Sequence, residues 1–245
     1  MIGSGPDQRE MSRRGFVAAG SGALLAGGLA GTGLIGSATA AAGEQAPAVP
    51  GPRAALRLLM AGNRRWVTGR AVHPHQSVAW RHHVAPHQEP FAVVVSCIDS
   101  RVPPEIVFDR GLGDMFIIRT GAQTLDGRVV LGSIEYGPVA YPSARLMVVL
   151  GHQRCGAVEA AIKVITGGGR APGDIQALVN ALRPAYRAAV GQPGDLLDNM
   201  VRAQTRLAVQ RLKADRLLRH LIATEGLMIV GGHYLLDSGE VQLLT

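Results

Sequence analysis

Cysteine and aromatic residues are both scarce in this chain of 245 residues. Only two cysteines occur, Cys97 and Cys155, so the sequence allows one disulfide or one pair of metal ligands, and no disulfide framework. Aromatic residues make up 4% of the chain against 47% for all hydrophobic types, so the core must be aliphatic. This composition is typical of parallel strands rich in Val, Ile and Leu, and the length suits one medium domain or two small ones.

Runs of like charge are missing as well. The formal net charge is +7, and much of it comes from arginines that are spread over the predicted helices. Dispersed charge is typical of a solvated surface rather than of a nucleic-acid footprint, so we expect no binding to DNA or RNA.

The N-terminal segment resembles an export signal. The run Ser12-Arg13-Arg14-Gly15-Phe16-Val17 matches the twin-arginine pattern, and a weakly hydrophobic Ala/Gly/Leu stretch follows it. We predict a twin-arginine-type signal over 1–42, a linker over 43–51, one folded domain over 52–245, and export to the periplasm or the cell exterior. An uncleaved membrane anchor is the alternative, which the glycines and alanines disfavour; after cleavage we expect no stable membrane span.

Short apolar runs alternate with helical patterns along the remaining chain. The runs that predict strands are Phe91–Val95, Met115–Ile118, Leu146–Leu150, Leu227–Val230 and Val241–Leu244. This alternation predicts an α/β fold with a mainly parallel sheet of about four strands plus an antiparallel edge strand, flanked by helices. A helix that begins at Pro52 precedes the sheet, and we expect it to extend to a partner subunit.

Prolines and histidines mark two further features of the chain. We expect Pro138 to end the helix predicted from Asp126, and Pro184 to interrupt the helix predicted over Asp174–Val190. Between Gly69 and Pro90 the sequence predicts a polar loop. It contains five histidines, which form a second metal site, a proton relay or, as we favour, part of a solvated connection: His73, His75, His82, His83 and His87.

Two of the predicted strands are each followed by metal-ligand side chains. Cys97, Asp99 and Arg101 follow the first strand, and His152 and Cys155 follow the third. Open α/β sheets carry their chemistry at the carboxyl ends of the strands, where residues two or three apart can face one point. Sulfur and nitrogen donors select zinc, so three ligands with an open position predict a catalytic centre and four predict a closed one.

The blocks around these residues resemble the β-class carbonic anhydrases. They are CIDSRVPPEIVFDRGLGDMFIIRTGA, GSIEYG and VVLGHQRCGAV, and the resemblance extends over about Ala54 to Leu244. It implies one zinc ion per chain on Cys97, His152 and Cys155, and a catalytic pair of Asp99 and Arg101. It also implies that Asp99 is a fourth zinc ligand in a closed state only.

The same resemblance implies where substrate binds. By position, four residues fall on the family's substrate pocket: Gln88, Phe116, Tyr136 and Gly156. The chain departs from the family pattern at Ile98 and over 120–123, where Thr-Gly-Ala-Gln replaces a commoner Asn-Ala-Gly-Asn run. We expect neither departure to touch a ligand.

The implied reaction is the reversible hydration of carbon dioxide to bicarbonate and a proton. Zinc-bound hydroxide would attack carbon dioxide, with Asp99 held by Arg101 to orient the nucleophile. The resemblance further implies a homodimer or homotetramer with the site near a subunit boundary. The alternatives are a hydrolase of carbonyl sulfide or carbon disulfide on the same scaffold, and a zinc-binding module without turnover.

Overall fold

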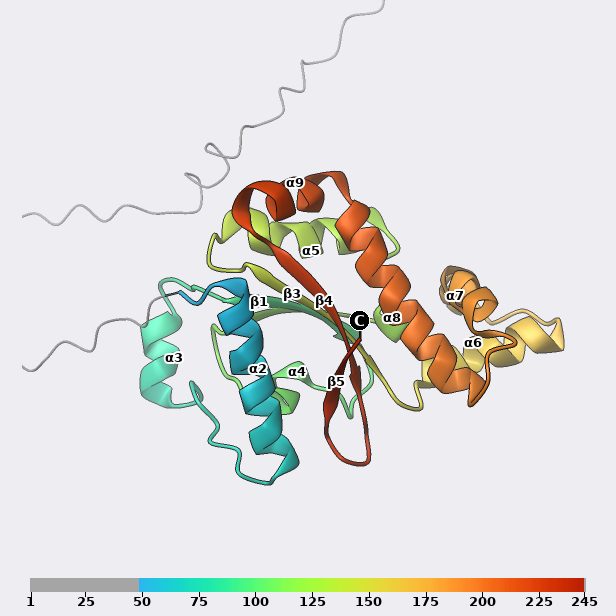
Figure 1. Ribbon diagram of the computed structural model, residues 1–245, viewed down its shortest axis with the longest axis horizontal. Coiled ribbons are helices and arrows are strands. Elements are labelled where there is room, and N and C mark those ends of the chain that lie inside the picture. Colours follow the sequence, from blue (N-terminus) through green and yellow to red (C-terminus); the bar gives the residue numbers. More distant parts are fainter. Residues whose placement is uncertain (1–48, 245) are drawn as a thin grey trace, which may run out of the picture. The chain divides into compact units, whose positions relative to one another are not determined.

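The computed structural model describes residues 49–244, and its centre is a five-stranded sheet (Figure 1). The strands are β1 (Ala92–Cys97), β2 (Met115–Thr120), β3 (Leu146–His152), β4 (Met228–Tyr234) and β5 (Val241–Leu244). Their order is β2-β1-β3-β4-β5, with all neighbours parallel except the antiparallel pair β4–β5. The predicted fold class is confirmed, whereas the predicted signal and most of the linker lie outside the described residues.

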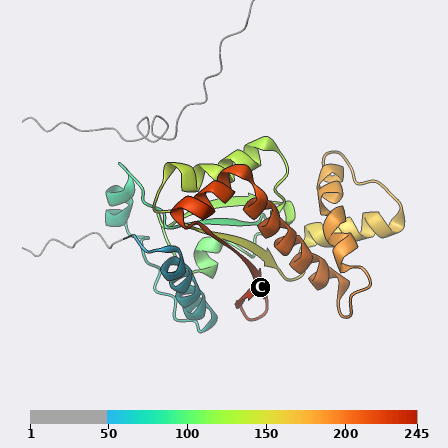
Figure 2. The same cartoon turned by 45° about the horizontal axis from the view of Figure 1, so that its top comes forward.

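Helices cover both faces of this sheet and extend past its carboxyl end (Figure 2). One face carries α2 (Pro52–Val67) and α4 (Pro104–Val107), and the other carries α5 (Arg128–Ala140), α8 (Leu196–Ala214) and α9 (Arg216–Glu225). Beyond the carboxyl ends of the strands, α6 (Gly156–Gly167) and α7 (Ile175–Ala189) pack against the first half of α8. Two short elements complete the list, α3 (Val78–Val84) and the 3₁₀ turn η1 (Gly121–Gln123).

The strands β1 and β3 are buried along their whole length because both of their faces are covered. Val94 packs into the cluster under α2, while Val93 and Val95 pack into the cluster under α5, α8 and α9. Full burial of each such side chain contributes about 2 kcal/mol, which explains why both runs are continuously apolar rather than alternating.

Two expectations about proline are wrong. Pro138 lies inside α5, which continues to Ala140, and Pro184 lies inside the uninterrupted helix α7. Each proline removes one backbone donor, but tertiary packing offsets the loss. In α5, Ile134, Gly137 and Pro138 are buried, and the carbonyl of Pro138 accepts a hydrogen bond from Arg145 Nη1 at 2.8 Å.

The histidine-rich segment is more ordered than a polar loop, because it contains α3. The hydroxyl of Ser77 caps this helix by accepting from the amide of Trp80. The Trp80 ring stacks on His75, with centroids 3.9 Å apart, and His75 Nδ1 lies 2.7 Å from Asp114 Oδ1. In the part of the chain that the structure describes, these histidines form no group of three metal-ligating side chains.

The first helix, α2, buries one stripe against its own sheet layer. Ala55 and Leu59 are fully buried there, while Leu58 and Trp66 are more than a third exposed. Its extension to a partner subunit stays a prediction. Within residues 49–244, no helix combines the length and apolar character needed to cross a bilayer.

Candidate metal centre and active site

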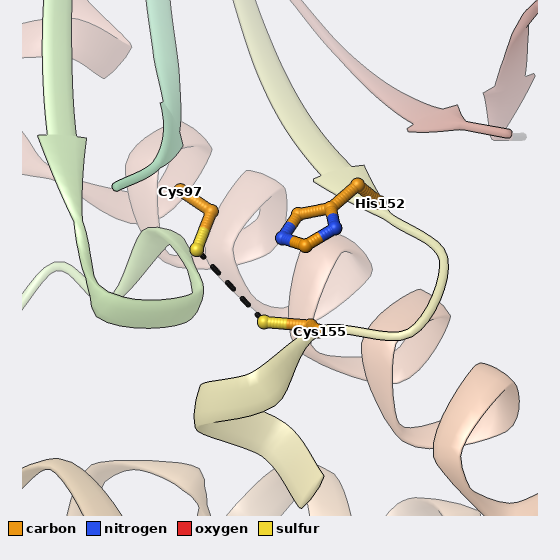
Figure 3. A group of neighbouring side chains, drawn as sticks. All are labelled: Cys97, His152 and Cys155. Atoms are coloured by element: carbon orange, nitrogen blue, oxygen red, sulfur yellow. Dashed lines mark hydrogen bonds between the residues drawn. The ribbon is translucent and has the colours of Figure 1, made fainter. Parts of the chain in front are cut away.

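Three side chains meet at the carboxyl edge of the sheet (Figure 3). Cys97 is the last residue of β1, His152 is the last residue of β3, and Cys155 is the N-cap of α6. Because β1 and β3 are parallel neighbours, their ends bring Cys97 and His152 to the same edge. The ligand atoms of all three residues lie within 4.8 Å of one another.

The donor set fits a zinc ion on three counts. The three residues are 2%, 0% and 1% exposed, so they are shielded from solvent. The ring atom His152 Nδ1 lies 2.8 Å from the carbonyl of Gln153, which assigns the proton to Nδ1 and leaves a lone pair on Nε2. That buried Nε2 has no hydrogen-bond partner among the described residues, a costly arrangement unless the nitrogen is a ligand. Both cysteines are free, with their sulfurs 3.8 Å apart.

The two thiols lie within hydrogen-bond distance of each other. The hydrogen bond between them lowers the pKa of Cys97 to about 4 and raises the pKa of Cys155, which burial raises further. His152 also lowers the pKa of Cys97, whereas the backbone amides of Ala157 and Val158 in α6 lower that of Cys155. The arrangement thus favours ionisation of Cys97 over Cys155, and a metal bound here would require both sulfurs as thiolates.

The turn after β2 reaches the metal group through its backbone. The amide of Ala122 donates to Cys97 Sγ at 3.3 Å, so the expectation that 120–123 does not touch a ligand is wrong. Ala122 and Gln123 both adopt left-handed conformations, with φ of 51° and 44°. Gln123 is held there by a hydrogen bond from its Nε2 to Thr205 Oγ1 at 3.1 Å. Ile98, in contrast, is 64% exposed.

Asp99 and Arg101 form a two-pronged ion pair beside the metal group. Arg101 Nε donates to Asp99 Oδ1 at 2.9 Å, and Arg101 Nη2 donates to Asp99 Oδ2 at 2.7 Å. The backbone amide of Arg101 adds a third hydrogen bond to Oδ1 at 3.0 Å. Arg101 thereby lowers the pKa of Asp99 to about 2 and keeps it ionised, while Oδ2 lies 3.9 Å from His152 Nε2.

Arg101 also links the two ligand-bearing turns. Its Nη2 donates to the carbonyl of Arg154, and Arg154 in turn makes a two-pronged pair with Asp237 on the β4–β5 connection. The carbonyl of Tyr234 accepts from the amide of Gln153, whose side chain accepts from the amide of Leu236. The segment between His152 and Cys155 is thus fastened on both sides.

The four predicted substrate residues divide between the two ends of the sheet. Gly156 adjoins Cys155 at the metal group. Phe116 pairs with Val93, four residues before Cys97, which separates it from the metal group by about 13 Å along the strand.

The two remaining substrate residues join Phe116 at the amino end. The Phe116 ring packs edge-on against Tyr136 and Tyr141, at centroid distances of 6.2 and 5.1 Å. The hydroxyl of Tyr141 lies 3.2 Å from Gln88 Nε2, which donates to it. The structure therefore brings Gln88, Phe116 and Tyr136 to one place, but not to the metal group of the same chain.

Sequence reasoning missed Arg119, which donates to the carbonyls of Cys97 and Asp99. The signal for it is a single charge at the end of an otherwise apolar strand. It also missed Gln153 and Arg154, which nothing in the spacing of His152 and Cys155 distinguishes.

A buried Cys₂His group with a carboxylate beside it, at the carboxyl end of a parallel sheet, defines a zinc enzyme of the α/β class. A family model described as carbonic anhydrase matches residues 92–241. A carbonic anhydrase 2 from Mycobacterium tuberculosis is 40% identical over 196 residues, covering 78% of this chain and 92% of the relative. A carbonic anhydrase from Mycolicibacterium smegmatis is 38% identical over 199 residues, covering 78% and 93%.

The fold has relatives among solved structures. The structure of tetrameric β-carbonic anhydrases from Sordaria macrospora matches with a TM-score of 0.62 and 22% identity, over 77% of this chain and 96% of that chain. The chain belongs to the carbonic anhydrase family, and its fold is that of the β-carbonic anhydrases. Its activity is that of a zinc-dependent carbonate dehydratase, and the group of Cys97, His152 and Cys155 could hold one zinc ion.

Proposed function

We propose that Asp99, held by Arg101, is the acceptor that makes this centre catalytic for the reversible hydration of carbon dioxide. The observation that supports it is the ion pair, in which Arg101 engages both carboxylate oxygens of Asp99. A carboxylate engaged in this way stays ionised and is restrained from turning toward the metal ligands. The Asp99 carboxylate is then held in place to accept a hydrogen bond beside the three metal-ligating side chains.

Each residue then has a separate task in the reaction. Cys97, His152 and Cys155 would hold zinc, which supplies the Lewis acidity that lowers the pKa of a coordinated water. Two thiolates would neutralise the charge of the ion, so zinc would lower the pKa of that water less than it does at a three-histidine site. Asp99 therefore accepts a hydrogen bond from the attacking oxygen, fixes its orientation and favours its deprotonation. Arg101 keeps the Asp99 carboxylate ionised throughout.

The test is to compare the wild type with Asp99→Asn, which keeps the shape of the side chain. We expect one zinc ion per chain in both proteins, and hydration that is about 100-fold slower in the variant. An unchanged rate in Asp99→Asn would remove the proposed acceptor. Parallel assays with carbonyl sulfide and carbon disulfide test the alternative substrates, which would be favoured if the wild type consumed them and left carbon dioxide unchanged.

We further propose that the active enzyme is a homodimer, or a tetramer built from such dimers. Gln88, Phe116 and Tyr136 lie away from the metal group of their own chain, and a second copy would bring them to it. The exposed stripe on α5 supports this arrangement, since Val129 and Tyr136 are 83% and 46% exposed and line a shallow hollow. Carbon dioxide or bicarbonate would then lie between two chains.

We also propose that the enzyme acts outside the cytoplasm. The pattern Arg13-Arg14 before a weakly hydrophobic stretch supports export by the twin-arginine route, which carries proteins already folded around their metal. Sequencing the N-terminus of protein recovered from the cell envelope tests the proposal. We expect a start near Ala41 or Gly43, and an intact Arg13-Arg14 in mature protein would contradict it.

A further inference from the structure

Arg119, near the end of β2, reaches across to the turn that follows β1. We propose that Arg119 is a positioning residue that holds Cys97 and Asp99 in register with each other. This inference rests on the proposed function of Asp99, because it concerns how that carboxylate is kept in place. The role is to hold the backbone carbonyls of Cys97 and Asp99, whereas Arg101 holds the side chain of Asp99.

The contacts of Arg119 are made with the backbone of the turn rather than with its side chains. Arg119 Nε donates to the carbonyl of Cys97 at 2.8 Å, and Nη2 donates to the carbonyl of Asp99 at 2.5 Å. Its side chain is half-buried. The two carbonyls flank Ile98, so one guanidinium spans the whole step from the metal ligand to the proposed acceptor.

Two backbone contacts place the same turn against the segment that follows Arg119. The amide of Ile98 donates to the carbonyl of Thr120 at 3.0 Å, and the amide of Ala122 donates to Cys97 Sγ at 3.3 Å. Residues 119–122 therefore contact each of the three residues from Cys97 to Asp99. Among the donors in this set only those of Arg119 belong to a side chain, so its contacts are the ones that substitution can remove cleanly.

An arginine suits this position because of its geometry. The Nε and Nη2 donors lie in one rigid plane, so they fix the separation and orientation of two carbonyls together. A lysine is a point charge on a flexible stem and satisfies one carbonyl without fixing the other. Loss of the fork leaves the Asp99 carbonyl free to turn and the carboxylate free to move with it.

Arg119 and Arg101 divide the control of Asp99 between them. Arg101 is half exposed and holds the carboxylate, whereas Arg119 lies on the β2 side and holds the backbone. If the backbone shifts, the Arg101 pair can follow it without breaking. Removal of Arg119 is thus expected to misplace an intact ion pair, which differs from the loss of that pair in an Arg101 variant.

The experiment compares Arg119→Ala and Arg119→Lys with Arg110→Ala as a matched control. Arg110 is a buried arginine that also donates to a backbone carbonyl, that of Leu58, but it lies over the Phe91 ring just before β1, away from the ligand turn. We measure metal per chain, the visible spectrum of the cobalt(II)-substituted proteins, kcat, and the recovery of kcat on addition of guanidinium ion. The spectrum reports the geometry of the metal ligands, Cys97 among them, without any turnover.

For Arg119→Ala we expect full metal content, a changed cobalt spectrum, and kcat reduced about 10- to 100-fold, with partial recovery in guanidinium. Arg119→Lys should be intermediate and should not respond to guanidinium. Arg110→Ala should unfold at a lower temperature but keep the wild-type spectrum and kcat.

A wild-type spectrum and kcat in both Arg119 variants would overturn the inference. So would a loss confined to thermal stability, as in the control. If Arg119→Ala does not fold, the spectrum of Arg119→Lys decides. If the Arg119 spectra change while Asp99→Asn keeps full activity, the proposed function fails and the positioning role stands.

Discussion

The two ends of the sheet differ in how much of their chemistry one chain can complete. At the carboxyl end, Cys97, His152 and Cys155 are buried within 4.8 Å of one another, and their turns are fastened to β2 and to the β4–β5 connection. At the amino end, the Phe116 ring packs against Tyr136 and Tyr141, and Gln88 donates a hydrogen bond to Tyr141. These residues lie away from the metal ligands, and Tyr136 is 46% exposed.

This difference teaches that the strand topology of one chain is enough to assemble the metal group, but not to bring Gln88, Phe116 and Tyr136 to it. Parallel strands must end together, so ligands at the ends of β1 and β3 converge in any chain that forms this sheet. Residues at the start of β2 are carried away from that edge by the same geometry. In the proposed dimer, the amino end of another chain would complete the site.

The largest expected effect comes from breaking the carboxyl end itself. Cys155→Ser replaces a thiolate with a hydroxyl that does not ionise near neutral pH, so zinc should be lost. We expect metal content below about one tenth per chain and hydration reduced at least about 1,000-fold. Metal analysis after gel filtration, combined with stopped-flow assays, checks both values. Full zinc occupancy in this variant would show that Cys155 is not a ligand.

A smaller loss is expected from Arg101→Ala, which leaves the metal ligands untouched. Asp99 loses its two-pronged partner and can approach the metal, so activity should fall about 100-fold while zinc stays at one per chain. The thermal stability should change little because Arg101 is half exposed. Exposed Arg154→Ala, which breaks only the pair with Asp237, is the matched control and should retain most activity. An active Arg101→Ala enzyme would contradict the gating role.

Mixing two impaired variants tests whether the two ends of the sheet meet between chains. Tyr136→Ala should lower activity about 10-fold, and Asp99→Asn about 100-fold, each with full zinc. If a site takes Asp99 from one chain and Tyr136 from its partner, refolding an equal mixture should restore about a quarter of wild-type activity, since half of the dimers hold one intact site. A mixture no more active than the average of its parents would place both residues in the same chain's site.

The sequence predicted the carboxyl end better than any other part of the molecule. The two β-branched runs before Cys97 and His152 identify buried parallel strands, and strand ends fix where ligands lie. Helix boundaries were harder, because packing of Ile134 and Gly137 on the sheet carries α5 through Pro138. The missed helix α3 depends on one Ser77 cap and one stacked Trp80, which leave little periodicity to detect.

Arg119 and Ala122 could not be found from spacing for a different reason. Their contacts to Cys97 run between neighbouring strands, so they depend on the pairing of β1 with β2 rather than on any local pattern. The Ala122 contact also uses a left-handed backbone that favours glycine or asparagine, which hides the turn from residue preferences. Sequence patterns therefore identify the metal-ligating residues, whereas the residues that hold them in place follow only from the pairing register of β1 and β2.

The carboxyl end also contains a buried histidine, and this makes its stability sensitive to acid. His233 on β4 is fully buried, with Nε2 2.9 Å from Asp198 Oδ1, and Arg202 pairs with the same carboxylate. Burial is the main cause that lowers the pKa of His233 to about 4, and Arg202 lowers it further, while Asp198 acts in the opposite direction.

The unfolded chain binds a proton at His233 near pH 6.5, before the folded chain does, so the stability contribution is complete above that pH and is lost progressively toward pH 4. Between about pH 7.5 and about pH 5.5 we expect the free energy of unfolding to fall by about 1 kcal/mol through this residue. Urea unfolding at both pH values checks it. His233→Gln should flatten the difference, whereas His220→Gln on the exposed surface of α9 should leave it unchanged. An equal pH dependence in wild type and His233→Gln would place the acid sensitivity elsewhere, with the amino end the next region to examine.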